Sequence, residues 1–284
     1  MIKNLQEEEF TLNTKAIGGK EEKYSIEGNI VEIFSSYQGE GGSVRGSCFG
    51  RRQIFIRLAG CDLKCDWCDT AQSRDPDYSE CKVEKKPGTW EFSTYKNPVS
   101  EDFVIEQVLN LSTKDFHSVS LTGGEPAYQE EFFYRIINRL YNLELPIYLE
   151  TNGYFPERIE KVAPNISYAC VDIKDRTANS VRKSEWKKLV EKELESIAIL
   201  NNHSVQVFAK IVVTEQTSLD DIRMYANKLR EIIVPVVVQP VTPIGNVGPI
   251  SHQKLFKITE VLAEVLPAEL YGISIQAHKL LSIL

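Results

Sequence analysis

The sequence lacks three features that would assign it to a broad class at once. It has no run of about 18 apolar residues, the length that a membrane-spanning helix requires, and its opening residues, MIKNLQEEEF, contain no apolar signal segment. It also lacks an excess of positive charge: the formal net charge is -7, whereas non-specific nucleic-acid binding depends on clustered lysine and arginine. We therefore expect a cytoplasmic protein with neither a membrane nor a nucleic-acid partner.

Cysteine is scarce as well. The 284 residues include six cysteines, and structural disulfides are not expected because a reducing compartment keeps thiols free. Three of the six, Cys61, Cys65 and Cys68, fall within eight residues of one another. That concentration indicates a metal site rather than a disulfide framework.

Short apolar, β-branched runs alternate with amphipathic stretches from residue 53 onward. This order is typical of βα units around a parallel sheet and predicts an α/β fold. The predicted strands are 53–58, 118–122, 147–150, 168–173, 205–213, 235–239 and 271–276, and the predicted helices are 100–112, 129–142, 156–162, 180–199, 217–232 and 251–265.

The chain is predicted to hold one domain, residues 29–284, after an N-terminal extension over 1–28. A short extra strand is expected at 29–34. Residues 71–99 are polar, interrupted by three prolines and weakly periodic, which predicts an insertion with room for a hairpin.

Polar and glycine-rich segments follow one predicted strand after another. The first three are GCDLKCDWC, GGEP and TNG. Because the carboxyl ends of parallel strands meet at one edge, these segments are expected to gather there and to build the active site.

The spacing CxxxCxxC of Cys61, Cys65 and Cys68 leaves three readings open. A structural zinc site needs four ligands and no second CxxC is present. A redox pair would leave one thiol surplus. A cubane iron–sulfur cluster with three protein ligands would leave one iron open for a substrate or cofactor.

The cysteine motif after the first strand and TGGEP at 122–126 after the second resemble the radical S-adenosylmethionine (radical SAM) superfamily. The resemblance implies a partial (β/α)6-like barrel and a 4Fe-4S cluster. It also implies that S-adenosylmethionine is the fourth ligand of that cluster.

Further segments are similar to one family, the 7-carboxy-7-deazaguanine synthases, over about residues 29–284. The insertion at 71–99 departs from that family's shortest members, and Ala277 stands where threonine is usual. The matching segments are EIFSSYQGEG (32–41), FIRLAGCDLKCDWCDT (55–70), TGGEP (122–126), ETNG (150–153), QP (239–240) and ISIQAHK (273–279).

The resemblance implies a radical reaction on a pterin. A 5′-deoxyadenosyl radical would abstract hydrogen from C6 of 6-carboxy-5,6,7,8-tetrahydropterin, and ring contraction with loss of ammonia would give 7-carboxy-7-deazaguanine for queuosine- or archaeosine-type biosynthesis. A flavodoxin or ferredoxin would supply the electron, Mg²⁺ would bind, and a homodimer is expected. The alternatives are a glycyl-radical-enzyme activase or another radical SAM enzyme and, outside the enzymes, a zinc-binding interaction protein.

Cofactor-binding residues are expected in the loops after the strands. The glycines of TGGEP bring backbone carbonyls close to a ligand, although an ordinary strand-to-helix turn has the same sequence. For Asn152 the alternative is an ordinary Asn-Gly turn, and for Lys174 it is a lysine exposed to solvent. The predicted cofactor-binding residues are Gly123, Gly124, Glu125, Glu150, Asn152, Lys174 and Gln239.

Substrate-binding residues are expected on the same edge. Glutamine and glutamate can form paired hydrogen bonds with the planar array of donors and acceptors on a pterin ring. Arg57 can bind a carboxylate through two hydrogen bonds, and its alternative role is a buried ion pair. By resemblance Thr70 would coordinate Mg²⁺, unless it is only a helix N-cap. The predicted substrate-binding residues are Gln38, Glu40, Arg57, Thr122, His278 and Leu284, the last through its terminal carboxylate.

Overall fold

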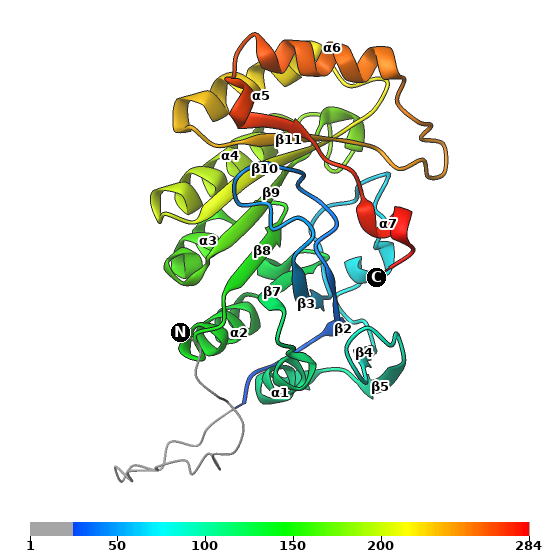
Figure 1. Ribbon diagram of the computed structural model, residues 1–284, viewed down its shortest axis with the longest axis vertical. Helices are drawn as coiled ribbons and strands as arrows, with labels where there is room; N and C mark the ends of the chain where they lie inside the picture. The colour runs from blue at the N-terminus through cyan, green and yellow to red at the C-terminus, as the bar shows by residue number, and fades with distance from the viewer. Residues whose placement is uncertain (1–24, 284) are drawn as a thin grey trace.

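The computed structural model describes residues 25–283 (Figure 1). Most of the predicted extension, 1–28, and Leu284 therefore lie outside the described residues. Among the helices within 25–283, none is both long and apolar enough to cross a lipid bilayer.

The core of the fold is an open, mostly parallel sheet of ten strands in the order β12-β11-β10-β9-β8-β7-β3-β2-β4-β5. The seven strands from β12 to β3 run parallel to one another, and β2 is antiparallel to β3. The sheet does not close in the described part of the chain, so the partial barrel is confirmed. The strands are β1 Glu27–Gly28, β2 Ile30–Tyr37, β3 Arg52–Leu58, β4 Glu80–Glu84, β5 Phe92–Lys96, β6 Val99–Ser100, β7 Phe116–Gly123, β8 Ile147–Thr151, β9 Tyr168–Ile173, β10 Gln206–Val213, β11 Val236–Pro240 and β12 Tyr271–Ile273.

Helices α1 to α6 follow the outer side of the sheet, whereas α7 lies on the inner side (Figure 1). Polar caps begin several of them: the Ser100 hydroxyl accepts a hydrogen bond from the Phe103 amide. Ser218 and Ser251 cap α5 and α6 in the same way. The helices are α1 Glu101–Leu111, α2 Glu130–Asn142, α3 Pro156–Val162, α4 Trp186–Asn202, α5 Leu219–Ile232, α6 His252–Ala263 and α7 Ala277–Leu281.

Alternate residues of each parallel strand face opposite sides of the sheet, because side chains in a strand have a period of two. In β10, Ala209 and Ile211 belong to the apolar core under the helices. Lys210 and Val212 instead line the cavity on the inner side. The same alternation carries Asp172 of β9 to the inner side, so charged side chains gather there.

Most predicted elements agree with the structure to within two residues at each end, and a few differ by three residues or more. The helix predicted over 180–199 begins only at Trp186, because the amide of Lys64 donates a hydrogen bond to the Ser180 carbonyl and holds that residue in a loop. The strand predicted over 271–276 ends at Ile273. The Ser274 amide still donates to the Val238 carbonyl of β11, while its hydroxyl accepts a hydrogen bond from the Gly41 amide, and α7 begins at Ala277.

The segment 71–99 contains the hairpin for which the sequence left room. Strands β4 and β5 pair antiparallel, and β4 also pairs with β2, so the hairpin extends the edge of the main sheet. The predicted extra strand at 29–34 is also present, as the longer β2.

Candidate active site

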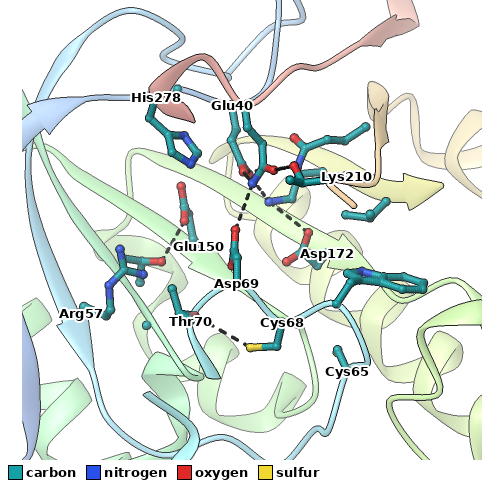
Figure 2. Close-up of a pocket in the computed structure, with 18 of the residues that line it drawn as sticks. Glu40, Arg57, Cys65, Cys68, Asp69, Thr70, Glu150, Asp172, Lys210 and His278 are labelled. Carbon is teal, nitrogen blue, oxygen red and sulfur yellow. Dashed lines mark hydrogen bonds and ion pairs between the residues drawn. The ribbon is translucent and has the colours of Figure 1, made fainter. Parts of the chain in front are cut away.

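A cavity of about 470 Å³ opens at the carboxyl ends of the parallel strands (Figure 2). Its lining includes the three clustered cysteines, the glycine-rich turn after β7, and side chains from β8 to β11. The 38–40 loop and α7 complete the wall on the opposite side. This is the edge at which the sequence placed the active site.

Cys61, Cys65 and Cys68 all line this cavity, and none of them forms a disulfide. Burial raises the pKa of Cys61 to about 12 and also raises the pKa of Cys65. The Cys61 and Cys65 thiols are therefore protonated at neutral pH until a metal displaces their protons. The remaining described cysteines, Cys48, Cys81 and Cys170, do not line the cavity, so no fourth thiol is available there.

The arrangement of these thiols fits a cluster better than a single ion. Within residues 25–283, no three cysteine, histidine, aspartate or glutamate side chains converge closely enough to hold one metal ion. A mononuclear zinc site requires such convergence, whereas the ligands of a cubane cluster bind different iron atoms. The three-cysteine loop thus favours the iron–sulfur reading of the motif.

The glycine-rich turn at 123–124 packs its backbone against residues on either side of the cysteine loop, which is the segment 61–70. A Cβ on Gly124 would lie 2.1 Å from the Gly60 carbonyl oxygen and 2.5 Å from that of Ser73. Gly123 has a φ of +135°, and a Cβ there would lie 2.2 Å from the Leu58 oxygen. No other residue fits these positions, and both glycines line the cavity.

Glu125 is predicted to bind the cofactor, but it does not line the cavity. It is fully buried, and its carboxylate accepts hydrogen bonds from the Thr151 hydroxyl at 2.8 Å and the Asn152 amide at 2.7 Å. Burial raises its pKa to about 7. The geometry makes Glu125 a brace between the turns after β7 and β8, which positions Asn152 beside Cys61 with Nδ2 3.8 Å from Sγ.

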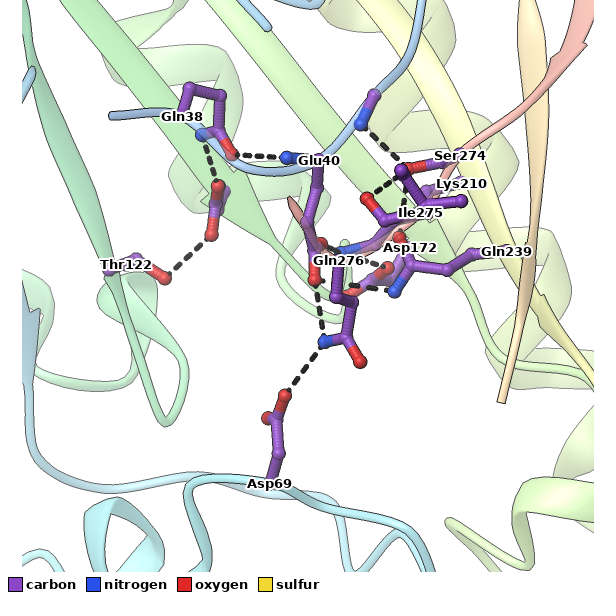
Figure 3. A network of polar contacts seen from close by, with 12 residues as sticks. Gln38, Glu40, Asp69, Thr122, Asp172, Lys210, Gln239, Ser274, Ile275 and Gln276 are labelled. Atoms are coloured by element: carbon purple, nitrogen blue, oxygen red, sulfur yellow. Dashed lines mark hydrogen bonds and ion pairs between the residues drawn. The ribbon is translucent and has the colours of Figure 1, made fainter. Parts of the chain in front are cut away.

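Gln38 and Thr122, labelled in Figure 3, join Glu150 in a polar network that lines the cavity. The Glu150 carboxylate accepts hydrogen bonds from Gln38 Nε2 at 2.7 Å and Thr122 Oγ1 at 2.8 Å. Burial raises the pKa of Glu150. The structure thus brings together three predicted residues from β7, β8 and the loop after β2.

Lys210 stands at the centre of a second network that sequence reasoning missed. Its ammonium forms an ion pair with Glu40 and lies 3.3 Å from Asp172 Oδ1 (Figure 3). Glu40 also accepts hydrogen bonds from Gln276 at 2.8 Å and Gln239 at 3.2 Å. A lysine inside the apolar run VQVFAKIVV was the available signal, because an unpaired charge there would be costly.

Predicted Lys174 lines the cavity beside the cysteine loop and pairs with Asp172 at 2.9 Å. Burial alone would lower the pKa of Lys174, but the Asp172 carboxylate raises it overall. The solvated alternative for Lys174 is therefore wrong.

Arg57 forms an ion pair with Glu32, with Nε 2.7 Å from Oε1, which is the role predicted as the alternative to binding a substrate carboxylate. Both side chains nevertheless line the cavity, so the guanidinium remains able to meet a ligand. Glu32 was not singled out from the sequence.

The C-terminal segment forms part of the cavity wall. The Ala277 amide donates to the Gly39 carbonyl, and His278 packs so closely that a Cβ on Gly39 would lie 2.6 Å from its Nδ1. Lys279 contacts Asp69 of the cysteine loop at 3.3 Å. Residues near the end of the chain therefore meet both the 38–40 loop and the cysteine loop.

Two further predicted positions have different outcomes. Thr70 lines the cavity with its hydroxyl 4.0 Å from Cys68 Sγ, and it makes no side-chain cap of the short 3₁₀ helix that follows. Leu284 lies outside the described residues.

The chain is similar to known proteins over most of its length. The family model described as the radical SAM superfamily matches residues 55–229. The 7-carboxy-7-deazaguanine synthase of Thermococcus kodakarensis is 43% identical over 90% of this chain and 98% of its own, and that of Methanocaldococcus jannaschii is 37% identical over 90% and 100%. The structure of QueE from Escherichia coli shares the fold, with a TM-score of 0.53 and 20% identity over 89% of this chain and 95% of its own.

Proposed function

The chain belongs to the radical SAM superfamily and, within it, to the 7-carboxy-7-deazaguanine synthase family, and from this premise we propose that it converts 6-carboxy-5,6,7,8-tetrahydropterin to 7-carboxy-7-deazaguanine with loss of ammonia. It is an enzyme of 7-deazapurine biosynthesis. The observation that carries the proposal is a single cavity lined by three free thiols on one side and the Gln38–Glu150 and Glu40–Lys210 networks on the other.

Superfamily membership implies a 4Fe-4S cluster and S-adenosylmethionine, and the residues present fit both. Cys61, Cys65 and Cys68 would hold the cluster. When bound, the two groups supply a 5′-deoxyadenosyl radical, which would take hydrogen from substrate C6. The protein's part is to bind, to orient and to exclude water.

The cofactor would lie between the cluster and the strand ends. The turn formed by Gly123 and Gly124 offers backbone carbonyls to its ammonium group, and Asn152 offers an amide beside Cys61. Lys174 supplies a cation for a carboxylate near the cysteine loop, and Gln239 borders the same cavity. Glu125 would act indirectly, by fixing the Asn152 backbone.

The substrate would lie against the two polar networks. Lys210 lowers the pKa of Glu40 against the raising effect of burial, so Glu40 is an ionised acceptor for the N–H groups of a pterin. Gln38, Thr122 and Glu150 present a second set of donors and acceptors. Arg57 would meet the substrate carboxylate, and His278 would cover the ring.

The same proposal includes Mg²⁺, an electron-donor protein and a second copy of the chain. Thr70, next to the cysteine loop and lining the cavity, would coordinate Mg²⁺ through its hydroxyl. A flavodoxin or ferredoxin would reduce the cluster, and the chain would act as a homodimer. A glycyl-radical-enzyme activase is disfavoured because the relatives that match 90% of this chain at 43% and 37% identity are 7-carboxy-7-deazaguanine synthases.

Anaerobic turnover tests the proposal. The reconstituted protein is incubated with S-adenosylmethionine, Mg²⁺, dithionite and 6-carboxytetrahydropterin, and product mass and 5′-deoxyadenosine are followed together. We expect 7-carboxy-7-deazaguanine from the native chain and none from Cys65→Ala. Formation of 5′-deoxyadenosine while the pterin survives unchanged would refute the assigned substrate.

A further inference from the structure

Two fully buried polar side chains, Gln53 of β3 and Ser118 of β7, lie behind the candidate active site. They are register partners in the sheet, and neither lines the cavity. Their chain neighbours Ile54 and Val119 belong to the apolar core under the helices, so Gln53 and Ser118 face the inner side. A buried amide is costly unless it is hydrogen-bonded, so the partners of Gln53 should explain why this position is polar.

Hydrogen bonds connect Gln53 to the wall of the cavity. Its Nε2 donates to Ser118 Oγ at 2.8 Å, and its Oε1 accepts from Gln38 Nε2 at 3.2 Å. Gln38 Nε2 also donates to Glu150 Oε1 at 2.7 Å. At the far end, Ser118 Oγ lies 3.0 Å from His117 Nδ1. Gln53 is therefore the link between strand β7 and a residue that lines the cavity.

These contacts use both amide hydrogens of Gln38. One hydrogen goes to Gln53 and the other to Glu150, while Gln38 Oε1 accepts from the Glu40 amide at 3.0 Å (Figure 3). Without the Gln53 oxygen, one N–H of a buried side chain would lose its acceptor. The Gln38 amide could then turn away from Glu150 and from the Glu40 backbone. Gln53 thus sets the orientation of Gln38.

The same pair of glutamines closes the base of a loop. Gln38 and Gln53 lie at the two ends of the segment 38–53, and the Gln38 amide also donates to the Arg51 carbonyl at 2.9 Å. This segment carries Glu40, whose carboxylate pairs with Lys210. The orientation of Gln38 therefore bears on both polar networks of the cavity.

We propose that Gln53 is a positioning residue for the reaction: through Gln38 it holds Glu150 and the loop that carries Glu40 in the arrangement that orients the substrate. The inference rests on the proposed function, which assigns these residues to the substrate side of the cavity. Ser118 acts one step further back, by holding the Gln53 amide. Since neither Gln53 nor Ser118 lines the cavity, they act on the alignment of the substrate and not on its chemistry.

Two variants interrupt the connection at different points. Gln53→Met removes the amide but keeps most of the side-chain volume. Ser118→Ala leaves Gln53 in place and removes only the acceptor of its Nε2, so it serves as a second test if Gln53→Met is poorly folded.

Ser120→Ala is the matched control. Ser120 lies two residues further along β7, on the same face of the sheet, and is also fully buried. Its hydroxyl has no hydrogen-bond partner within residues 25–283, and Ser120 does not line the cavity. The control therefore deletes the same atom from the same strand without breaking the connection.

The experiment uses the reconstituted holoenzyme under anaerobic conditions. Three quantities depend on the pterin: kcat/KM, the ratio of 5′-deoxyadenosine to product, and the dissociation constant of pterin-6-carboxylate, an oxidised and fluorescent analogue of the substrate. Two quantities do not: the cluster absorption, and the rate of S-adenosylmethionine cleavage by dithionite without substrate.

We expect Gln53→Met to lower kcat/KM about tenfold or more, since a misplacement of about 1 Å can cost about 100-fold. It should also weaken binding of the analogue and raise the ratio of 5′-deoxyadenosine to product several-fold, because a misaligned substrate is converted less often per cleaved cofactor. Ser118→Ala should change the same quantities in the same direction by about threefold. Both variants should keep the cluster absorption and the substrate-free cleavage rate within about twofold of native, and the control should keep all five quantities.

Native kcat/KM and a native ratio in Gln53→Met would overturn the proposal, as would equal losses in Ser118→Ala and Ser120→Ala. Losses in Ser118→Ala that extend equally to the cluster absorption and the substrate-free cleavage would show a merely structural role and would also overturn it. Failure of the proposed function has a different signature: the native chain makes no product, while the affinities for the analogue still decide whether Gln53 positions the ligand. A native chain that neither binds the analogue nor makes product would overturn both.

Discussion

Replacing Lys210 with methionine tests the network that tertiary structure, rather than sequence, revealed. The Lys210 side chain is 10% exposed and that of Glu40 is 12% exposed, so the ion pair is nearly removed from water. Methionine keeps most of the volume but leaves Glu40 without a cationic partner. Breaking a buried pair in this way costs about 3–5 kcal/mol. Asp172, the other carboxylate beside Lys210, would still pair with Lys174 at 2.9 Å. We therefore expect the free energy of unfolding to fall by an amount near the lower end of this range, about 3 kcal/mol.

The loss should depend on pH in a defined direction. In the native chain burial raises the pKa of Glu40 but Lys210 lowers it overall. The pair therefore stabilises the fold above the unfolded-state pKa of glutamate, about 4.3, and that contribution is lost as the pH falls through the folded-state pKa. In Lys210→Met burial acts without the lysine, and protonation of Glu40 relieves the penalty. The difference between the two chains should be largest near neutral pH and narrow below about pH 5.

Urea denaturation of the metal-free chain, followed by tryptophan fluorescence at several pH values, measures this difference. Lys187→Met, on an exposed lysine of α4, is the matched control and should change the free energy of unfolding by less than about 0.5 kcal/mol. Lys210→Met/Glu40→Gln should recover part of the loss, because it removes the uncompensated charge. A loss below about 1 kcal/mol, or one that does not vary with pH, would refute the reasoning.

Three further predictions concern the cysteine loop and its neighbours. Cys65→Ala should lose the cluster absorption and 5′-deoxyadenosine formation, whereas Cys81→Ala should keep both; equal loss in the two would contradict the assignment of the ligands. Gly124→Ala should lower the iron content after reconstitution several-fold, because its Cβ would lie 2.1 Å from the Gly60 oxygen; native iron content would show that the turn can relax. Thr70→Ala should keep the cluster but require about tenfold more Mg²⁺ for half-maximal turnover, and an unchanged Mg²⁺ titration would refute its role as a ligand.

Much of the fold follows from local sequence. The alternation of apolar runs and amphipathic stretches predicted the parallel strands and the helices that cover them, because side-chain periodicity is fixed within each element. Ser100, which directly precedes the amphipathic run of α1, caps that helix. Errors fell where a tertiary contact overrode the local pattern. Residues near Ser180 bond to the cysteine loop instead of joining α4.

The sequence by itself determined the cysteine loop and the loop segments that gather at the carboxyl edge, because the spacing of ligands and the ends of strands are local properties. The tertiary structure alone decided which charges meet. Lys210 and Glu40 lie 170 positions apart, and Gln276 lies 236 positions from Glu40. Their contacts depend on strand order and on the path of the loop after β2, and no local pattern encodes either. For the same reason only the tertiary structure shows that Glu125 connects two turns: its partners are Thr151, the last residue of the neighbouring strand β8, and Asn152, which follows it.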